Sequence, residues 1–336
     1  DTLLTPEARA APWYVYQTIV HGSTAPGFLF ASGFVAGLPR APLSLRASWR
    51  RARRLVFVLG VGYALHLPYL SFWKTRAATS AEKAALFACD ALQVIAVTQI
   101  LVLALQLLAG RRWTRLAAAL GLVMLAVGPL VWSSAVSGRF PPALAAYLDE
   151  RTGSRFPVFP FSVFVLAGTL AGATVGRADP RRRKWRAVLS GLALFFGGLL
   201  LAVALRGRVD FWSISPAYVL VRLGALLLLL RLVEAAADSN FPGIRSLALL
   251  GHETLLVYVL HLILLFGGVV GPSPLVAFHG RLGYAEALAA TLAMVPLLLL
   301  AAAAWRGVKH HAPHGATLTL AFLAIWLVYE FLTRPW

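Results

Sequence analysis

The sequence predicts an all-α protein, a polytopic membrane helix bundle with ten visible transmembrane helices. Hydrophobic residues make up 59% of the 336 residues and charged residues only 13%, whereas soluble globular domains carry about 25% charged residues. The apolar residues also gather into stretches of the length that a bilayer requires, about 20 residues, with most basic residues between them. Because no stretch of mixed composition is long enough for a soluble domain, residues 1–336 are expected to form a single transmembrane domain.

Ten apolar stretches are candidates for spans, and each is bounded by polar or basic residues. In chain order they are 24–39, 55–73, 85–109, 116–135, 157–175, 187–205, 216–233, 246–268, 286–305 and 315–332. Pro157 and Pro160 open the fifth stretch, and proline suits the first turn of a helix.

The distribution of Lys and Arg predicts the orientation of these helices. One alternating set of loops holds 19 of these residues, and the other loops and the termini hold 11. The richer set comprises 40–54, 111–115, 176–186, 231–245 and 306–311. The positive-inside rule makes it cytoplasmic and places residue 1 on the extracytoplasmic side. Because the chain starts without methionine, we expect either a cleaved signal peptide or a missing first helix, which would give eleven helices in the intact protein.

Charge and cysteine content argue against nucleic-acid binding, a disulfide and a metal site. The net charge of +18 would suggest nucleic acid in a soluble protein, but here the basic residues lie between apolar spans. Topology therefore explains them better, with anionic membrane lipids as further partners and no nucleic acid. The single cysteine, Cys89, excludes an intrachain disulfide, and no Cys/His spacing predicts a metal site.

The stretch 246–268 carries ionisable residues where a bilayer makes them costly, so a functional role is expected. Thr254, Tyr258 and His261 are spaced i, i+4 and i+7, which places them on one helix face. In a straight helix His261 lies ~22 Å from the cytoplasmic end. That depth makes it the leading candidate for a catalytic residue.

Four further polar residues are predicted at the same extracytoplasmic level: Asp90, Arg222, His66 and His21. We expect them to converge with His261 in a water-accessible pocket. Structural alternatives stay open, because Arg222 and Asp90 could each reach the interface or pair with one another, and His66 could be a hydrogen-bonded core histidine.

The cytoplasmic loops suggest a site for phosphate. Arginine is suited to bidentate phosphate contacts, and the candidates for binding a phosphate-bearing cofactor are Arg181, Arg182, Arg183, Arg51 and Arg54. The alternative is that these residues only determine topology and contact lipid headgroups.

Several segments together resemble the heparan-α-glucosaminide N-acetyltransferase-like family of bacterial polytopic membrane acyltransferases. These segments are TAPGFLFASGFVAGL (24–38), CDALQVIAVTQILVL (89–103), FPVFPFSVFVLAGTLAG (156–172), FWSISPAYVLVRLG (211–224) and LGHETLLVYVLHLILLFG (250–267). The resemblance implies eleven helices in the bacterial inner membrane and a catalytic histidine at the place of His21. It also implies acetyl-CoA as the donor and a glycan as the acceptor. Homologous membrane enzymes are often dimeric, so a homodimer is an alternative to a monomer.

The residue map fits transmembrane acetyl transfer. A neutral histidine can remove the acceptor's proton, Asp90 can orient that histidine, and Arg222 or Tyr258 can donate to the developing oxyanion. The main alternative is a proton-coupled transporter or flippase that uses the same His, Asp and Arg residues as a relay. An inactive scaffold or sensor of the same fold is a third possibility.

Overall fold

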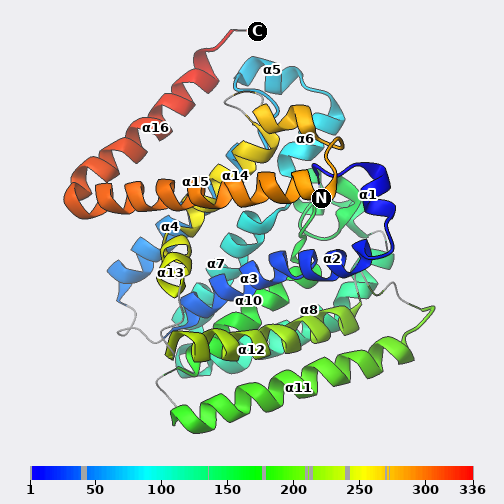
Figure 1. Cartoon of the computed structure of the whole chain (residues 1–336). Helices are drawn as coiled ribbons and strands as arrows, with labels where there is room; N and C mark the ends of the chain where they lie inside the picture. The colour runs from blue at the N-terminus through cyan, green and yellow to red at the C-terminus, as the bar shows by residue number, and fades with distance from the viewer. Residues whose placement is uncertain are drawn as a thin grey trace. The chain divides into compact units, whose positions relative to one another are not determined.

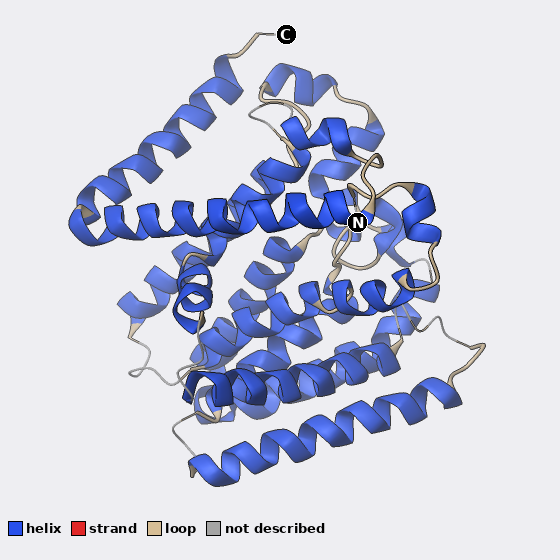
Figure 2. Cartoon of the chain, viewed as in Figure 1, coloured by secondary structure: helices blue, strands red, loops and turns tan. Residues whose placement is uncertain are grey.

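In the computed structural model the chain is helical throughout its described part, which comprises residues 2–38, 44–134, 136–175, 179–208, 211, 215–238, 243–268, 271 and 273–335. Within these residues the chain forms no β-strand, and only two isolated β-bridges occur (Figure 2). The all-α prediction is therefore confirmed for the described residues.

The chain divides into two compact units, each assembled from segments that are distant in sequence. The first unit contains Asp1–Thr18, Leu67–Lys83 and Ala236–Trp336, and the second contains Ile19–His66 and Ala84–Ala235. The prediction of one domain over 1–336 stays a prediction.

The second unit holds most of the buried core, and its main helices are labelled in Figure 1. They are α3 (Thr24–Gly37), α4 (Leu45–Leu65), α7 (Ala91–Ala109), α8 (Trp113–Ser133), α10 (Val158–Ala173), α11 (Pro180–Ala204) and α12 (Pro216–Asp238). Shorter helices complete it: η1 (Gly110–Arg112), η2 (Val136–Arg139), α9 (Pro142–Ala145) and η3 (Glu150–Thr152). α2 (Tyr14–His21) and α6 (Ser80–Phe87) run from one unit into the other.

The first unit contains two long helices near the end of the chain and a broken helix before them. Its elements are α1 (Pro6–Ala10), α5 (Phe72–Ala77), α13 (Ile244–His252), α14 (Thr254–Phe266), η4 (Pro274–Phe278), α15 (Tyr284–His311) and α16 (Pro313–Thr333). α13 and α14 both contact α15.

Among the described residues, four helical segments are long and apolar enough to cross a membrane: Ala91–Ser133, Arg181–Ala204, Tyr284–His311 and Pro313–Thr333. The bent pair α13–α14 adds a fifth if it is one span. Nine of the ten predicted stretches coincide with a helix or a helix pair, whereas 55–73 overlaps α4 only up to Leu65 and then includes the non-helical residues 66–71. However, α3 has 14 residues and α10 has 16, fewer than the ~17 that a span needs. Ten transmembrane helices therefore stay a prediction.

Two helix starts differ from the predicted boundaries for local reasons. Asp90 accepts a hydrogen bond from the amide of Ala91 and forms a capping box with Gln93, so α7 begins at residue 91 rather than 85. Ser44 caps α4, which therefore includes the arginine-rich segment that the sequence predicted as a loop. Arginine is a good helix former, so this extension has a low cost.

The closest helix contact in the second unit joins α3 to α10 through two glycine pairs. Gly33 and Gly37 form a GxxxG pattern on α3, and Gly168 and Gly172 form another on α10. A Cβ atom at any of the four would lie 2.0 to 2.1 Å from a carbonyl oxygen of the facing helix. The backbones are thus in direct contact, as in membrane helix pairs with small residues at the interface.

Candidate functional site

Tyr258 and His261 lie one turn apart on α14. Their rings meet edge to face with 5.3 Å between centroids, and both side chains are half-buried. His261 Nδ1 is 3.2 Å from the carbonyl oxygen of Val257. An Nδ1–H that donates to this carbonyl leaves Nε2 as an acceptor, which is the tautomer that a general base requires. Thr254, predicted on the same face, donates its hydroxyl to the carbonyl of Gly251 across the break, near the end of α13.

Glu253 interrupts the helix predicted over 246–268. The axes of α13 and α14 differ by 86° at this residue. The Glu253 carboxylate, whose residue is only 6% exposed, is 2.6 Å from Nζ of Lys309 on α15. A buried carboxylate is stable only with such a partner, so the ion pair holds the break.

The break corrects the predicted depth of His261. Because α13 turns away, it adds no rise along the axis of α14. His261 follows Glu253 by eight residues, which gives a rise of about 12 Å rather than the ~22 Å expected of a straight helix. His261 is therefore nearer to the level of Lys309 than the sequence predicted.

His66 and Asp90 form a second group, in the other unit. His66 Nε2 is 3.6 Å from Asp90 Oδ2, and Nδ1 is 3.1 Å from the carbonyl oxygen of Ala88. Nδ1 also lies 3.5 Å from the Gln93 side-chain amide nitrogen, so the contacts of both ring nitrogens are with Asp90 and with residues at the start of α7. Burial raises the pKa of Asp90, but hydrogen bonds from His66 and from the Ala91 amide outweigh it, and the pKa is lowered overall. This group is built to hold the start of α7.

His21 ends α2, and the turn that follows it is held by α12. Tyr218 donates its hydroxyl to the carbonyl oxygen of Gly22 at 3.2 Å, and Arg222 donates to the hydroxyl of Ser23. The Arg222 guanidinium also lies 5.2 Å from the Tyr218 ring centre. Arg222 is 6% exposed, so it does not extend to an interface. Burial lowers the pKa of His21, which favours its neutral form near pH 7.

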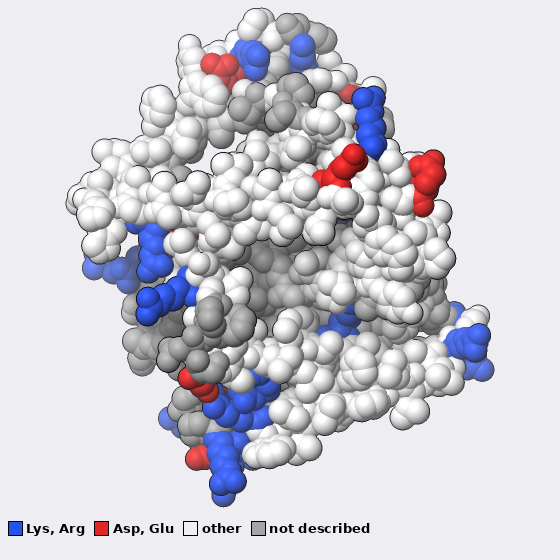
Figure 3. Space-filling model, viewed as in Figure 1, with Lys and Arg blue, Asp and Glu red and all other residues white. Residues whose placement is uncertain are grey.

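A cavity of about 680 Å³ lies inside the second unit, between α3, α10, α11 and α12. Its walls are mainly apolar, with Phe30, Phe34, Leu170, Leu194, Leu223 and Leu227 among them. At one end it is lined by Arg183, Arg186, Arg231 and Glu234. Figure 3 shows basic side chains gathered where α11 begins and α12 ends, with acidic side chains among them.

The predicted phosphate-binding arginines have different positions within this unit. Of the five, Arg183 lines the cavity, while Arg181 and Arg182 are exposed on the first turn of α11. Arg54 is exposed on α4. Arg51 joins three helices, since it donates to the Gln106 side chain on α7 at 2.9 Å and to the Ala36 carbonyl on α3 at 3.1 Å.

Sequence reasoning missed three charged residues of the cavity, Arg186, Arg231 and Glu234. Glu234 accepts from Arg183 at 2.9 Å and is paired with Arg231. The spacing of Arg231 and Glu234, three residues apart on one helix, was a readable signal for a local ion pair.

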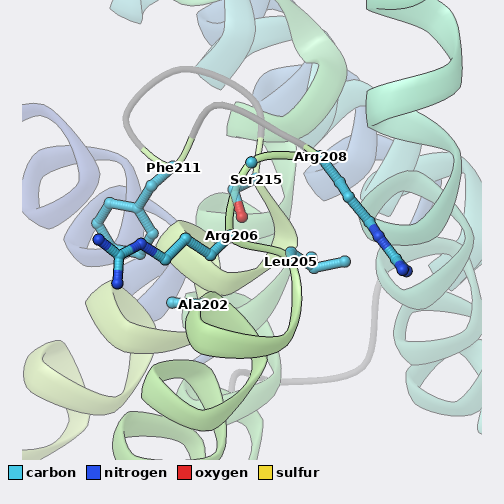
Figure 4. Close-up of a pocket in the computed structure, with 7 residues that line it drawn as sticks. Ala202, Leu205, Arg206, Arg208, Phe211 and Ser215 are labelled. Carbon is cyan, nitrogen blue, oxygen red and sulfur yellow. The ribbon is translucent and has the colours of Figure 1, made fainter.

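A second cavity of about 490 Å³ lies at the opposite end of α11 (Figure 4). Arg206 and Arg208 both line it, but Figure 4 shows them extending in opposite directions, Arg206 on the side of Phe211. Two guanidinium groups that diverge do not form a joint anion site.

The structure thus brings the predicted residues together in three pairs: Tyr258 with His261, His66 with Asp90, and the turn after His21 with Arg222. The first pair belongs to one compact unit and the other two belong to the second. Convergence of all of them in one pocket stays a prediction.

Comparison with known proteins gives one match. The model of the family described as "Acyltransferase domain" matches residues 3–306, nearly the whole chain and every candidate site residue. A search of curated proteins and a search of solved structures found no match.

Proposed function

The chain belongs to the acyltransferase domain family, and from this premise we propose that it moves an acetyl group across a membrane. The donor is acetyl-CoA on the cytoplasmic side. The acceptor is an amine or hydroxyl of a glycan on the extracytoplasmic side of the bacterial inner membrane. The proposal takes donor and acceptor from the resemblance to the heparan-α-glucosaminide N-acetyltransferase-like family, which the family match supports at the level of acyl transfer.

The observation that carries the proposal is the hydrogen bond between His261 and Val257. It supports a His261 with Nε2 as the base. In the reaction Nε2 takes the proton of the acceptor as its oxygen or nitrogen bonds to the thioester carbonyl carbon. The carbon–sulfur bond then breaks, and the thiolate receives the proton to give CoA. Tyr258 is placed beside this imidazole to donate to the oxyanion.

His21 is proposed as the second catalytic histidine. Its lowered pKa favours the neutral form, and Arg222 and Tyr218 contact the turn that follows it. Arg222 is the proposed partner for negative charge at this position. His66 and Asp90 are proposed as positioning residues, because their contacts are with each other and with the start of α7.

The donor is proposed to dock through its phosphates on the exposed arginines at the cytoplasmic end. Arg181, Arg182 and Arg54 suit this role because they are exposed. Arg183 and Arg51 have contacts within the unit, and we propose that they support the docking surface. Replacing Arg181, Arg182 and Arg183 together by glutamine is expected to weaken CoA binding in a direct titration.

The test is incubation of purified protein with labelled acetyl-CoA and a panel of glycan amines and hydroxyls. His261→Ala and His21→Ala are each expected to reduce transfer about 10²–10⁴-fold, the usual contribution of a general base. His310→Ala is the matched control, because His310 is an exposed histidine at the end of α15. Full transfer by both catalytic variants, with folding unchanged in all three, would refute the assigned chemistry.

A transporter or flippase is the second candidate, and one observation favours it. Transporters often carry helices broken within the membrane, and α13–α14 is an apolar helix pair with a break, at which the Glu253–Lys309 ion pair lies. Uptake of a glycan or lipid into vesicles without acetyl transfer would favour this function over the enzyme.

A further inference from the structure

The cavity between α11 and the rest of the second unit has the form of an apolar slot with a charged mouth. Along α11 it extends from Arg183 to Leu194, eleven residues or about 16 Å of helix. Along α12 it extends over the same number of residues, from Glu234 back to Leu223. Both helices place their charged residues at one end of the slot and leucines at the other.

The mouth carries a surplus of positive charge. Three guanidinium groups line it against one carboxylate, which leaves two positive charges in excess. Glu234 is shared by Arg183 and Arg231, whereas Arg186 forms no ion pair with another described residue. The Nε of Arg231 is buried and has no hydrogen-bond partner among the described residues. An anionic group with several acceptor oxygens, such as a phosphate, complements this set.

The walls suit an alkyl chain. Beyond the mouth, the hydroxyls that line the slot belong to Thr114, Thr174 and Ser190, and the Thr174 hydroxyl already donates to the Ala171 carbonyl at 2.7 Å. A pantetheine arm would bring amide groups that require hydrogen bonds, and unpaired amides in an apolar site are costly. A hydrocarbon chain has no such requirement.

The slot is also accessible from the exposed face of α11. Only 11% of the apolar window of α11 is buried inside the protein, and Trp185 and Leu189 are each 61% exposed. In a membrane protein such a face contacts lipid. Arg186 and Ser190 line the slot and are themselves exposed, so the slot reaches that surface.

We propose that this slot binds one anionic phospholipid, with its phosphate at Arg186 and Arg231 and one acyl chain between α11 and the α3–α10 pair. The lipid fills the space that separates α11 from the core. This proposal does not depend on acetyl transfer and holds for any function of the chain.

The test measures phospholipid that stays with the protein after detergent washing, by native mass spectrometry. The protein is first reconstituted in phosphatidylglycerol or in phosphatidylcholine. We expect about one phosphatidylglycerol per chain and at least tenfold less phosphatidylcholine. Ala187→Phe fills the slot from α11 and is expected to lower retention at least tenfold. Leu189→Phe, on the exposed face of the same helix, is expected to retain the wild-type amount.

A second pair of variants tests the mouth without altering the walls. Arg186→Gln is expected to abolish the preference for phosphatidylglycerol, whereas Arg182→Gln, one turn earlier and outside the slot, keeps it. Because Arg186 is exposed, its replacement does not endanger folding, so the test stands even if Ala187→Phe fails to fold.

Three outcomes would overturn the proposal. The first is equal retention of the two lipids by the wild type and all four variants. The second is retention of inorganic phosphate alone to the same degree as phosphatidylglycerol, which would show that the acyl chain does not contribute to binding. The third is displacement of phosphatidylglycerol by acetyl-CoA together with loss of CoA binding in Ala187→Phe, which would assign the slot to the donor.

Discussion

Replacing Gly168 by alanine tests the glycine contact between α3 and α10. The added Cβ would lie 2.0 Å from the carbonyl oxygen of Phe30. Because a Cβ is about 1.5 Å from its Cα, the existing Cα···O distance is at most about 3.5 Å, within the range of a weak Cα–H···O contact. The blocking atom is backbone, so no side-chain rotation can relieve the clash.

The magnitude follows from the movement required. Carbon and oxygen need about 3.3 Å, so the helices must separate by about 1.3 Å at this point. A gap of 0.5–1 Å already removes a quarter to a half of the attractive energy of a van der Waals contact. We therefore expect a loss of about 3 kcal/mol in the free energy of unfolding, the upper part of the range for overpacking. That loss corresponds to a decrease of about 6 °C in melting temperature.

The assay is thermal unfolding in detergent at one scan rate, followed by intrinsic fluorescence. Gly60→Ala is the matched control, because Gly60 is also helical and a Cβ there meets nothing within 4 Å. Alanine at that position is expected to stabilise the protein by about 0.5–1 kcal/mol. Equal melting temperatures for Gly168→Ala and the wild type would show that the helices are not in backbone contact.

Three further predictions concern charged residues. Lys309→Met leaves the buried Glu253 carboxylate unpaired and should lower the free energy of unfolding by about 2 kcal/mol. This is less than for a fully buried pair, because Lys309 is 42% exposed. The prediction would be contradicted if the double variant Glu253→Gln/Lys309→Met lost as much stability as Lys309→Met alone. The pKa of Asp90 lies below its ordinary 3.8 in the folded protein, so its contribution to stability is present above about pH 4 and is lost as pH falls through the folded value. Acid titration of unfolding should therefore show a weaker loss below pH 4 in Asp90→Asn than in the wild type, and identical curves would disprove it. Arg51→Met should lower stability by about 1–3 kcal/mol in denaturant titrations because it removes two hydrogen bonds that join α4 to α7 and α3, whereas Arg54→Met, on an exposed residue, should change it by less than about 0.5 kcal/mol.

The sequence was sufficient for the positions of the long apolar helices and insufficient for the short helices and for the ends and bends of the long ones. Apolar runs locate helices because burial in lipid depends on composition, which is local. The start of α7 was also readable, since Asp90 and Gln93 have the spacing of a capping box. The break at Glu253 was not, because it depends on Lys309, which lies 56 residues later.

In the candidate site too, features set by local sequence were predicted and features set by distant residues were not. The Tyr258–His261 pair follows from helix periodicity and was predicted. The groups around Asp90 and Arg222 depend on which helices meet, so the sequence predicted their polar character but not their partners. The apolar slot is lined by residues of five helices, and no single segment carries its signal.

The short reach of α14 has a consequence for the lipid around it. Thirteen residues rise about 20 Å, roughly 10 Å less than the hydrocarbon thickness of a typical bilayer. If α14 crosses the bilayer without α13, the lipid beside it must thin or water must fill the difference, and either response is a known answer to hydrophobic mismatch. A thioester and a sugar that approach from opposite faces would then be separated by a hydrocarbon layer about a third thinner than elsewhere in the membrane. The helix that carries His261 would itself shorten the distance that the acyl group has to travel.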